Sequence, residues 1–182
     1  KRLGWKYYDK ELVKAVAEKT GFDPRFIEER GEFSVGKSLL SYALAGQGMP
    51  GVMNGMSASD FLWCMQREVI LKLAEEGGCV VVGRCADYIL AGRPDVVRVF
   101  VHADKDFCLE QAMKVDSLPE NEVAKKIAEI DEYRARYYKH HTGHDWYDAR
   151  NYDLSLNSGV LGFEGAVEEI VKYMEVRSEF CK

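Results

Sequence analysis

The chain has 182 residues, of which 47% are hydrophobic and 30% are charged, and its formal net charge at pH 7 is -5. A chain of this size and composition buries a full hydrophobic core, so we expect one folded domain, 1–182, and exclude a disordered protein. The negative charge supplies no overall positive field that would attract a phosphate backbone, and we therefore expect no nucleic-acid partner.

The N-terminal part is predicted to begin with a short strand, residues 5–8, followed by a helix. Asp9 is a residue type that caps helix N-termini, and Gly21 is the type that ends helices. Between them, apolar residues recur at helical spacing. The helix residues that we expect to be buried are Leu12, Val13, Val16 and Ala17. A short charged helix is expected to follow Pro24.

A glycine-rich stretch, residues 46–59, is predicted to be a mobile loop. Ser57 and Asp60 fit a capping box at the start of a long helix, and Gly77 and Gly78 mark its end. The apolar residues expected on one side of this helix are Phe61, Leu62, Met65, Val69, Ile70 and Leu73.

The C-terminal half is predicted to alternate strands with helices. CVVVGR, residues 79–84, is a continuous apolar run, which is typical of a parallel strand covered on both faces. Further strands are predicted over 96–103 and 152–157, with a helix over 118–140 between them. A last helix is expected to bury Val167, Ile170, Val171 and Met174. This order favours a doubly wound α/β fold.

Residues 31–38, GEFSVGKS, fit the phosphate-loop pattern, in which Gly36, Lys37 and Ser38 would contact nucleotide phosphates. A working loop of this kind follows a buried strand and opens a helix, because both direct backbone N–H groups at the phosphates. The preceding residues here, FIEER, are charged and helical in pattern. The alternative is an ordinary loop that leads into a short helix.

Three blocks of sequence carry a resemblance to a known family. VVVGRCADYIL (80–90), VFVHAD (99–104) and the long block 131–158 resemble the cytidylate kinase-like family of P-loop nucleoside monophosphate kinases, as does LGWKYYDKEL near the start. The resemblance implies a three-layer P-loop kinase-like fold, with a mostly parallel sheet and helices on both faces. It also implies phosphoryl transfer from ATP, with Mg²⁺, to a nucleoside monophosphate, cytidylate being the named acceptor. The stretch 46–59 would be a mobile acceptor-side loop, and 105–145 a lid-like segment.

In this family the phosphate loop follows the first strand, and its helix runs into the segment that begins KRLGWKYYD here. The resemblance places that strand in the middle of the sheet, between the strands predicted over 79–84 and 96–103. Without it, backbone groups on two inner edges would stay unpaired, at about 1–3 kcal/mol for each buried group. We therefore expect the natural protein to carry this strand and loop, and GEFSVGKS to be a chance match.

Two arginines are the candidate catalytic and acceptor-binding residues. Gly83 and Arg84 follow a buried strand, where open α/β sheets place their ligands, and a guanidinium there either holds a phosphate or forms a structural salt bridge. Asp131 and Arg134 are three residues apart, so they share a helix face, as a surface pair or as part of a site. The resemblance implies that Arg84 and Arg134 hold the acceptor phosphate, and that Asp131 reads the base or orients Arg134.

Asp9 is predicted to be a helix N-cap, and the resemblance implies a position at the crevice from which it reaches Mg²⁺ through water. The lid-like segment departs from the family pattern, because Cys108 and Gln111 stand where arginines would neutralise the transferring phosphoryl group. The basic residues that could substitute there are Lys114, Lys125 and Lys126. A non-catalytic nucleotide-binding or regulatory module is therefore the alternative to a kinase.

Three histidines, His140, His141 and His144, lie close in sequence to Asp145 and Asp148. Imidazole and carboxylate are standard metal ligands, so a metal hydrolase is a third option. Adjacent histidines point in different directions on a helix, however. We therefore expect a solvated cluster and no metal bound by protein ligands alone.

The expected function is thus a kinase whose partners are ATP and a nucleoside monophosphate. Five cysteines, odd in number and without a CxxC pair, favour reduced thiols and a cytoplasmic location. No stretch has the length of a membrane span, so we expect no membrane association.

Overall fold

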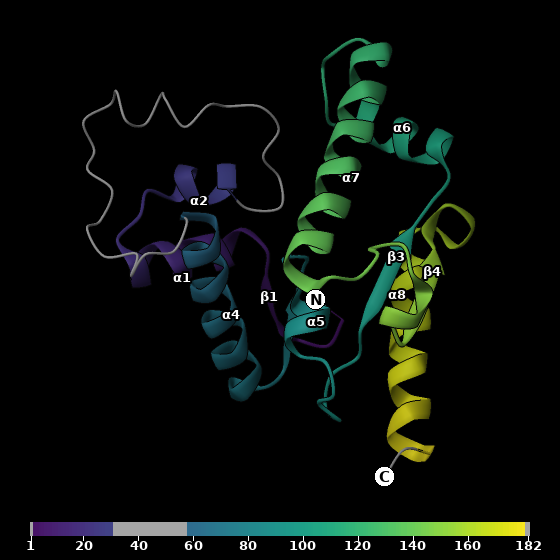
Figure 1. The fold of residues 1–182 in the computed structure, drawn as a ribbon. Coiled ribbons are helices and arrows are strands. Elements are labelled where there is room, and N and C mark those ends of the chain that lie inside the picture. The colour runs from purple at the N-terminus through teal and green to yellow at the C-terminus, as the bar shows by residue number, and fades with distance from the viewer. Residues whose placement is uncertain (1, 31–57, 181–182) are drawn as a thin grey trace, which may run out of the picture.

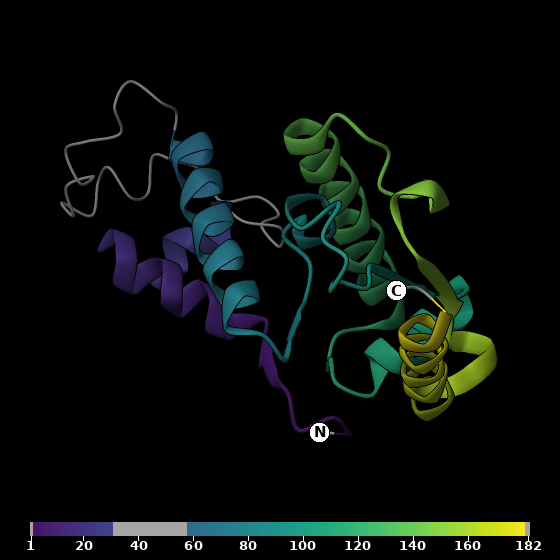
Figure 2. The same cartoon turned by 90° about the horizontal axis from the view of Figure 1, so that it is seen from below.

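The computed structural model describes residues 2–30 and 58–180, and Figures 1 and 2 show it from two directions. The elements of the first half are β1 (Lys6–Tyr8), α1 (Lys10–Thr20), α2 (Pro24–Arg30), α4 (Ala58–Glu76), β2 (Cys79–Val81) and α5 (Ala86–Ile89). The remaining elements are β3 (Val99–His102), α6 (Lys105–Met113), α7 (Glu120–Thr142), η1 (Ala149–Asn151), β4 (Leu154–Asn157) and α8 (Ser158–Phe180). No helix in the described ranges is both long and apolar enough to cross a membrane.

The strands form two parallel pairs. β1 pairs with β2, with Lys6 opposite Cys79, and β3 pairs with β4, with Val99 opposite Leu154. Parallel strands need crossover connections, and helices supply them: α1, α2 and α4 lie between β1 and β2 in the chain, and α6 and α7 between β3 and β4. The predicted alternation of strands and helices is confirmed, and the chain is a mixed α/β protein.

The strand predicted over 79–84 is shorter than expected, and one of its faces is open. Val81 packs against the main core, whereas Val80 and Val82, on the opposite face of β2, are 43% and 37% exposed. On β3, Val101 is 51% exposed. The prediction of a strand covered on both faces is therefore wrong for the described residues. The physical reason is that, in residues 2–30 and 58–180, the core packs against the Val81 side of β2 and the opposite side stays open.

The main core lies between α1 and α4, which pack side by side (Figure 1). Its fully buried apolar residues on α1, α2, α4 and the α1–α2 connection are Leu12, Val13, Val16, Phe22, Ile27, Leu62, Val69 and Ile70. Ala86, the first residue of α5, and Leu90, just after its end, are also part of this core. The predicted apolar faces of α1 and α4 are confirmed, because helical spacing alone brings their residues to one side.

Gly21 ends α1 as predicted, in a left-handed conformation with φ 72°, and its N–H donates to the Ala17 carbonyl at 2.8 Å. A Cβ added at Gly21 would meet no atom within 4 Å, so a substitution there is opposed by backbone conformation and not by packing.

We expect Gly21→Ala to lower the free energy of unfolding by about 1–2 kcal/mol, because a Cβ disfavours the left-handed region. Gly21→Asn should cost less, because asparagine tolerates this region better than alanine does. Urea unfolding of both variants tests the prediction. Equal stability of Gly21→Ala and the wild type would contradict it.

One residue of the predicted packing face of α8 is exposed, whereas Ile170, Val171 and Met174 are partly buried. Val167 is 40% exposed, whereas Ala166 beside it is buried and Ile170 is partly buried. Gly162 interrupts the helix with φ 68° and ψ 173°, so the residues after it take a new orientation against β3 and β4. The expectation that Val167 is buried is therefore wrong, because the sequence pattern does not set the rotation of a helix after such an interruption.

An ion pair joins the starts of β3 and β4. The Asp153 carboxylate accepts hydrogen bonds from Arg98 N at 2.9 Å, Nε at 3.2 Å and Nη2 at 2.7 Å. Arg177 of α8 lies 3.7 Å from the same carboxylate. Beside this network, the Phe100 ring stacks on Tyr152 with ring centroids 4.9 Å apart. The network ties α8 to both strands.

Candidate functional site

The candidate site is built at the ends of two neighbouring parallel strands. Asp9 follows β1, and Gly83 and Arg84 follow β2. The two strands remain side by side at this point, because Val82 N donates to the Tyr8 carbonyl at 3.0 Å. Since β1 and β2 are parallel, the residues that follow them lie at the same end of the sheet, the carboxyl end of the strands. Open α/β folds place their ligands at this end.

The turn after β2 has an uncommon backbone. Gly83, Arg84 and Cys85 all have positive φ values, of 67°, 55° and 55°. For a residue with a side chain this conformation costs about 1–3 kcal/mol, and it persists only where the surroundings impose it. Ala86 N donates to the Gly83 carbonyl at 3.0 Å and closes the turn into α5. The turn therefore holds Arg84 in one position.

Arg84 is 2% exposed and is the largest of the fully buried side chains in the described residues. A guanidinium is stable inside a protein only beside an anion or a set of hydrogen-bond acceptors. Its burial agrees with both predictions made from the sequence, a structural ion pair and a ligand for a phosphate.

The C-terminal half of α7 covers the turn that contains Arg84. Both views place α7 between the group α1, α2 and α4 and the group β3, β4 and α8 (Figures 1 and 2). Cys85 packs against Tyr137 and Tyr138 of α7. The Tyr137 hydroxyl donates to Gln66 Oε1 of α4 at 3.1 Å in a buried hydrogen bond. These contacts fix α7 relative to α4 and to the turn.

A second hydrogen bond joins α7 to α5. The Tyr138 hydroxyl donates to Asp87 Oδ2 at 2.6 Å. Burial raises the pKa of Asp87, and the hydrogen bonds from Tyr138 and from the backbone partly oppose this shift. Burial and the Asp87 carboxylate raise the pKa of Tyr138, so this phenol keeps its proton and acts as the donor. No sequence pattern indicated this pair, because its members are on separate elements.

Asp131 and Arg134 form the ion pair that helical spacing predicts, with Arg134 Nη1 3.0 Å from Asp131 Oδ1. The Arg134 side chain is 31% exposed, and that of Asp131 is 40% exposed. Arg134 precedes Tyr137 and Tyr138 by three and four residues, so it shares the side of α7 that contacts Cys85. Along α7, Arg134 lies about one helical turn, roughly 5.4 Å, from that contact, and Asp131 lies about two turns from it.

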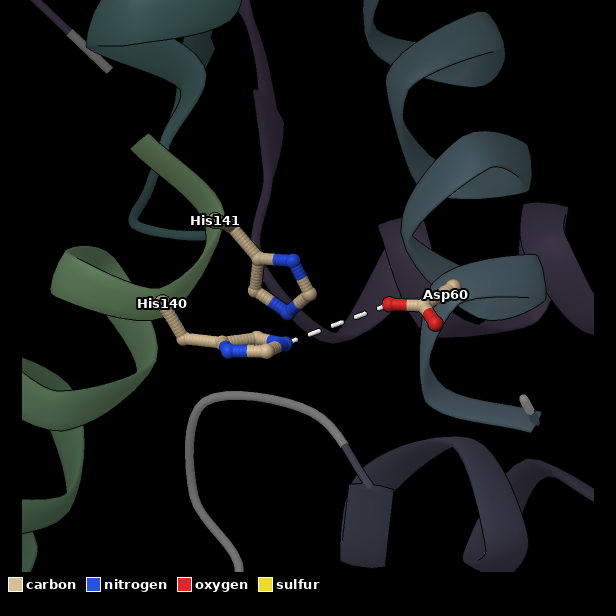
Figure 3. A group of neighbouring side chains, drawn as sticks. All are labelled: Asp60, His140 and His141. Atoms are coloured by element: carbon tan, nitrogen blue, oxygen red, sulfur yellow. Dashed lines mark ion pairs between the residues drawn. The ribbon is translucent and has the colours of Figure 1, made fainter. Parts of the chain in front are cut away.

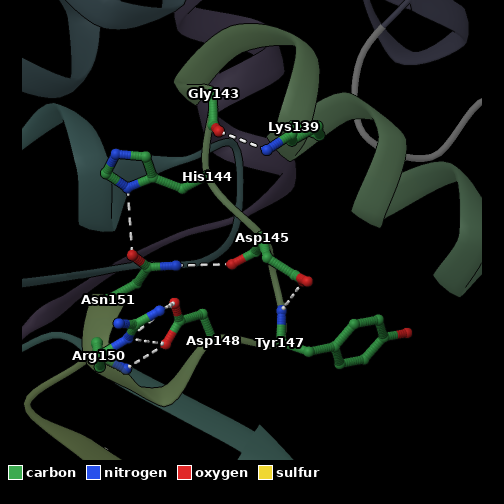
Figure 4. A network of polar contacts seen from close by, with 8 residues as sticks. All are labelled: Lys139, Gly143, His144, Asp145, Tyr147, Asp148, Arg150 and Asn151. Atoms are coloured by element: carbon green, nitrogen blue, oxygen red, sulfur yellow. Dashed lines mark hydrogen bonds and ion pairs between the residues drawn. The ribbon is translucent and has the colours of Figure 1, made fainter.

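Tyr147 is a residue of this region that the sequence analysis did not single out. Burial raises the pKa of its phenol, Asp131 raises it further, and Arg134 opposes the shift. The phenol is therefore within electrostatic range of both members of the pair. Its ring is 57% exposed and points away from the Asp148–Arg150 ion pair (Figure 4). An aromatic ring beside an acid–arginine pair has the chemistry to stack on a planar ligand.

Asp9 occupies the N-cap position of α1, but its side chain forms no capping hydrogen bond. The backbone angles of Asp9, φ -128° and ψ -87°, lie outside the usual N-cap region. Its carboxylate instead accepts a hydrogen bond from the Tyr7 hydroxyl at 3.5 Å. The predicted side-chain cap is therefore wrong, because the carboxylate is turned toward the strand and not toward the first helical turn.

The lysines that could replace the lid arginines all lie in ion pairs. Lys114 pairs with Glu110 at 2.9 Å and Lys125 with Glu129 at 3.6 Å, and Lys126 lies 2.6 Å from an Asp116 carboxylate oxygen. Their side chains are more than half exposed. Exposed pairs contribute about 0–1 kcal/mol, so each lysine can leave its partner at little cost.

The histidines predicted to cluster are separated by the end of α7. His144 Nδ1 lies 3.2 Å from Asn151 Oδ1, and Asn151 Nδ2 donates to the Asp145 carbonyl at 2.7 Å (Figure 4). Asp148 binds Arg150, whose hydrogen bonds lower the pKa of Asp148 to about 2. These hydrogen bonds hold together the segment that follows α7.

His140 and His141 lie elsewhere, beside Asp60 of α4. Gly36, Lys37 and Ser38, and the loop 46–57, lie outside the described residues.

The sequence of this chain matches one known protein family. The profile of the cytidylate kinase-like family matches residues 1–160. The chain belongs to this family. Membership in the cytidylate kinase-like family indicates nucleotide kinase-like activity. The matched range, residues 1–160, includes all the candidate residues described above. A comparison with curated proteins gives no match.

The fold of this cytidylate kinase-like protein has a solved relative. The crystal structure of an uncharacterized protein from Eubacterium ventriosum matches 91% of this chain and 89% of its own length, with a TM-score of 0.61 and 22% sequence identity. At this identity the likeness concerns the fold. The chain therefore shares its overall fold with that protein over most of its length.

Proposed function

We propose that this protein transfers a phosphoryl group from ATP to a nucleoside monophosphate, with cytidylate as the preferred acceptor. The observation that carries the proposal is the placement of Arg84. This arginine is buried in a strained turn at the carboxyl end of β2, and α7, which bears Asp131 and Arg134, covers that turn. In this proposal Arg84 and Arg134 bind the acceptor phosphate, and Asp131 orients Arg134 or reads the base.

The chemistry of the reaction suits these residues. Phosphoryl transfer proceeds through charge on the transferring group, so the protein contributes mainly position and electrostatic stabilisation. A guanidinium donates two parallel hydrogen bonds to a phosphate and keeps its charge at every working pH. The ring of Tyr147, beside Asp131 and Arg134, supplies a surface for the acceptor base.

The donor in this proposal is ATP with Mg²⁺. Mg²⁺ prefers oxygen ligands such as phosphates and the Asp9 carboxylate, and it neutralises charge on the phosphates during transfer. We expect the phosphate loop on a further parallel strand between β2 and β3. The lack of a ladder between these strands in residues 2–30 and 58–180, which leaves one edge of each available for pairing, supports this expectation. The free thiols of Cys64, Cys79, Cys85 and Cys108 favour a cytoplasmic location.

A nucleotide panel tests the proposal directly. The full-length protein is incubated with Mg²⁺–ATP and, separately, CMP, dCMP, UMP, AMP or GMP, and ADP release and the nucleoside diphosphate product are quantified. We expect the highest kcat/KM with CMP. ADP release that does not depend on any acceptor would overturn the proposal.

The second candidate is a nucleotide-binding module without catalysis. The observation in its favour is the lid-like segment, where residues 105–133 contain no arginine and Lys114, Lys125 and Lys126 are paired with carboxylates. Nucleotide binding in the same panel, without turnover of any acceptor, would select this candidate.

Arg134 and Arg136 offer a matched comparison on one helix. Arg134→Ala is expected to raise the KM for the acceptor about tenfold, because it removes one charge-assisted hydrogen bond to the phosphate. Arg136→Ala, which removes only an exposed pair with Glu132 at 3.6 Å, should leave the KM unchanged. Steady-state kinetics of the two variants provide the measurement. Equal effects of the two substitutions would contradict the assigned role of Arg134.

A further inference from the structure

Two helices that are far apart in the sequence bring three metal-ligating side chains together. Asp60 comes from the first turn of α4, and His140 and His141 come from the last turn of α7. One ligand atom of each residue lies within 4.8 Å of the others, and His140 Nε2 is 3.9 Å from Asp60 Oδ1. Figure 3 shows a ring nitrogen of each histidine turned toward the Asp60 carboxylate. The three side chains therefore face a common point.

The position of His141 is held by aromatic packing. Its ring stacks on Trp63 of α4, with centroids 4.5 Å apart and an interplanar angle of 11°, and meets the edge of Tyr137 at 4.4 Å. Trp63 is three residues from Asp60, so the surface that holds His141 belongs to the same face of α4 as the carboxylate. The geometry of the group is thus set by packing between α4 and α7.

The two histidine rings are neighbours even though their residues are adjacent on a helix. Their centroids are 4.7 Å apart, with an interplanar angle of 74°. The sequence analysis expected adjacent histidines to point in different directions, and this expectation is wrong here. The reason is that Trp63 and Tyr137 draw the His141 ring toward α4, on the side where His140 also reaches Asp60.

The chemistry and exposure of these groups suit metal binding. A neutral imidazole offers a nitrogen lone pair to a metal ion. The side chains of His140 and Asp60 are 67% and 52% exposed, so an ion has access from solvent.

We propose that Asp60, His140 and His141 form a binding site for a transition-metal ion, Zn²⁺ in the first place, that bridges α4 and α7. Two imidazoles and one carboxylate are a ligand set for Zn²⁺, with water in the fourth position. Ligand atoms around a tetrahedral Zn²⁺ lie about 3.3 Å apart, given bonds of about 2.0–2.1 Å. Small side-chain rotations of His140 and Asp60 close the present separations to this value. Mg²⁺ and Ca²⁺ prefer oxygen ligands and do not suit the site.

The test uses the full-length protein after removal of metals with a chelator. Co²⁺ serves as a spectroscopic probe, Zn²⁺ is added in competition, and equilibrium dialysis gives the stoichiometry. We expect one ion per chain, and quenching of Trp63 fluorescence by Co²⁺. Zn²⁺ at about 100 times its Kd should raise Tm by about 5–10 °C. Millimolar Mg²⁺ should not displace Co²⁺.

Variants distinguish metal binding at this site from metal binding by other side chains of the protein. Asp60→Asn and His140→Gln should each weaken Co²⁺ binding at least tenfold, and both side chains are exposed enough for the fold to tolerate the change. His144→Gln and Cys64→Ser are the controls, because His144 pairs with Asn151 and Cys64 is an exposed thiol one turn from Asp60. Both controls should bind within twofold of the wild type. No stoichiometric binding, or binding that the controls lose and Asp60→Asn keeps, would overturn the proposal.

Discussion

Arg84→Met is expected to raise the Kd for CMP about 100-fold or more, with little change in the stability of the fold. The guanidinium that binds a phosphate through two charge-assisted hydrogen bonds contributes about 3 kcal/mol or more to affinity, which corresponds to this factor. Methionine fills a similar volume without charge, so the buried site around Arg84 stays packed. Isothermal titration with CMP and urea unfolding measure the two effects.

The same variant distinguishes the two roles predicted for Arg84. If the guanidinium belonged to a structural ion pair, its removal would leave a buried anion uncompensated, and unfolding would become easier by about 3–5 kcal/mol. The Kd for CMP would then change only as a result of the lower folding stability. Arg84→Lys adds a further check, because lysine keeps the charge and lacks the planar fork, so we expect an intermediate Kd. Arg136→Met is the control, because it makes the same substitution at an exposed arginine of α7 that has no role in the proposed site.

Asp153→Ala is expected to have the largest effect on stability. The substitution removes three hydrogen bonds from Arg98 and the ion pair with Arg177, and it leaves the Arg98 guanidinium, which is 26% exposed, without its carboxylate. We expect the free energy of unfolding to fall by about 3 kcal/mol, and Tm by about 6–12 °C. Thermal unfolding at pH 7 provides the measurement.

The pH dependence of this effect has a definite sign. The hydrogen bonds from Arg98 lower the pKa of Asp153 in the folded protein, while its value in the unfolded chain is about 3.9. The stabilisation is therefore complete above about pH 4 and is lost as the pH falls through the folded-state pKa. The stabilities of the wild type and Asp153→Ala should converge in acid.

Glu175→Ala is the control, because it removes only an ion pair with Lys172 within α8, in which the side chains are 57% and 73% exposed. We expect this variant to lose less than about 0.5 kcal/mol. A loss equal to that of Asp153→Ala, or a difference from the wild type that is independent of pH for Asp153→Ala, would argue against the ion pair as the cause.

Several features that depend on nearby residues followed the spacing in the sequence. Leu12 and Val16 of α1 share a buried face, Gly21 ends the helix in the left-handed region, and Asp131 reaches Arg134 across one turn of α7. These features depend on helix period and on backbone preferences, which are properties of the local sequence. The resemblance of blocks such as GRCADYIL to one family is also a property of the sequence, because it rests on residue identities, and the family match over residues 1–160 confirms it.

Contacts between distant segments followed from packing alone. The hydrogen bond from Tyr138 to Asp87, the ion pair of Arg98 with Asp153, and the approach of Asp60 to His141 each join residues from different elements. No spacing in the sequence encodes them. They depend on how α7 is rotated and seated between α4, α5 and the strands β3 and β4, and that placement is decided by the fit of whole apolar surfaces. The open face of β2 and the exposure of Val167 have the same origin, because burial is a property of what lies across from a residue in space.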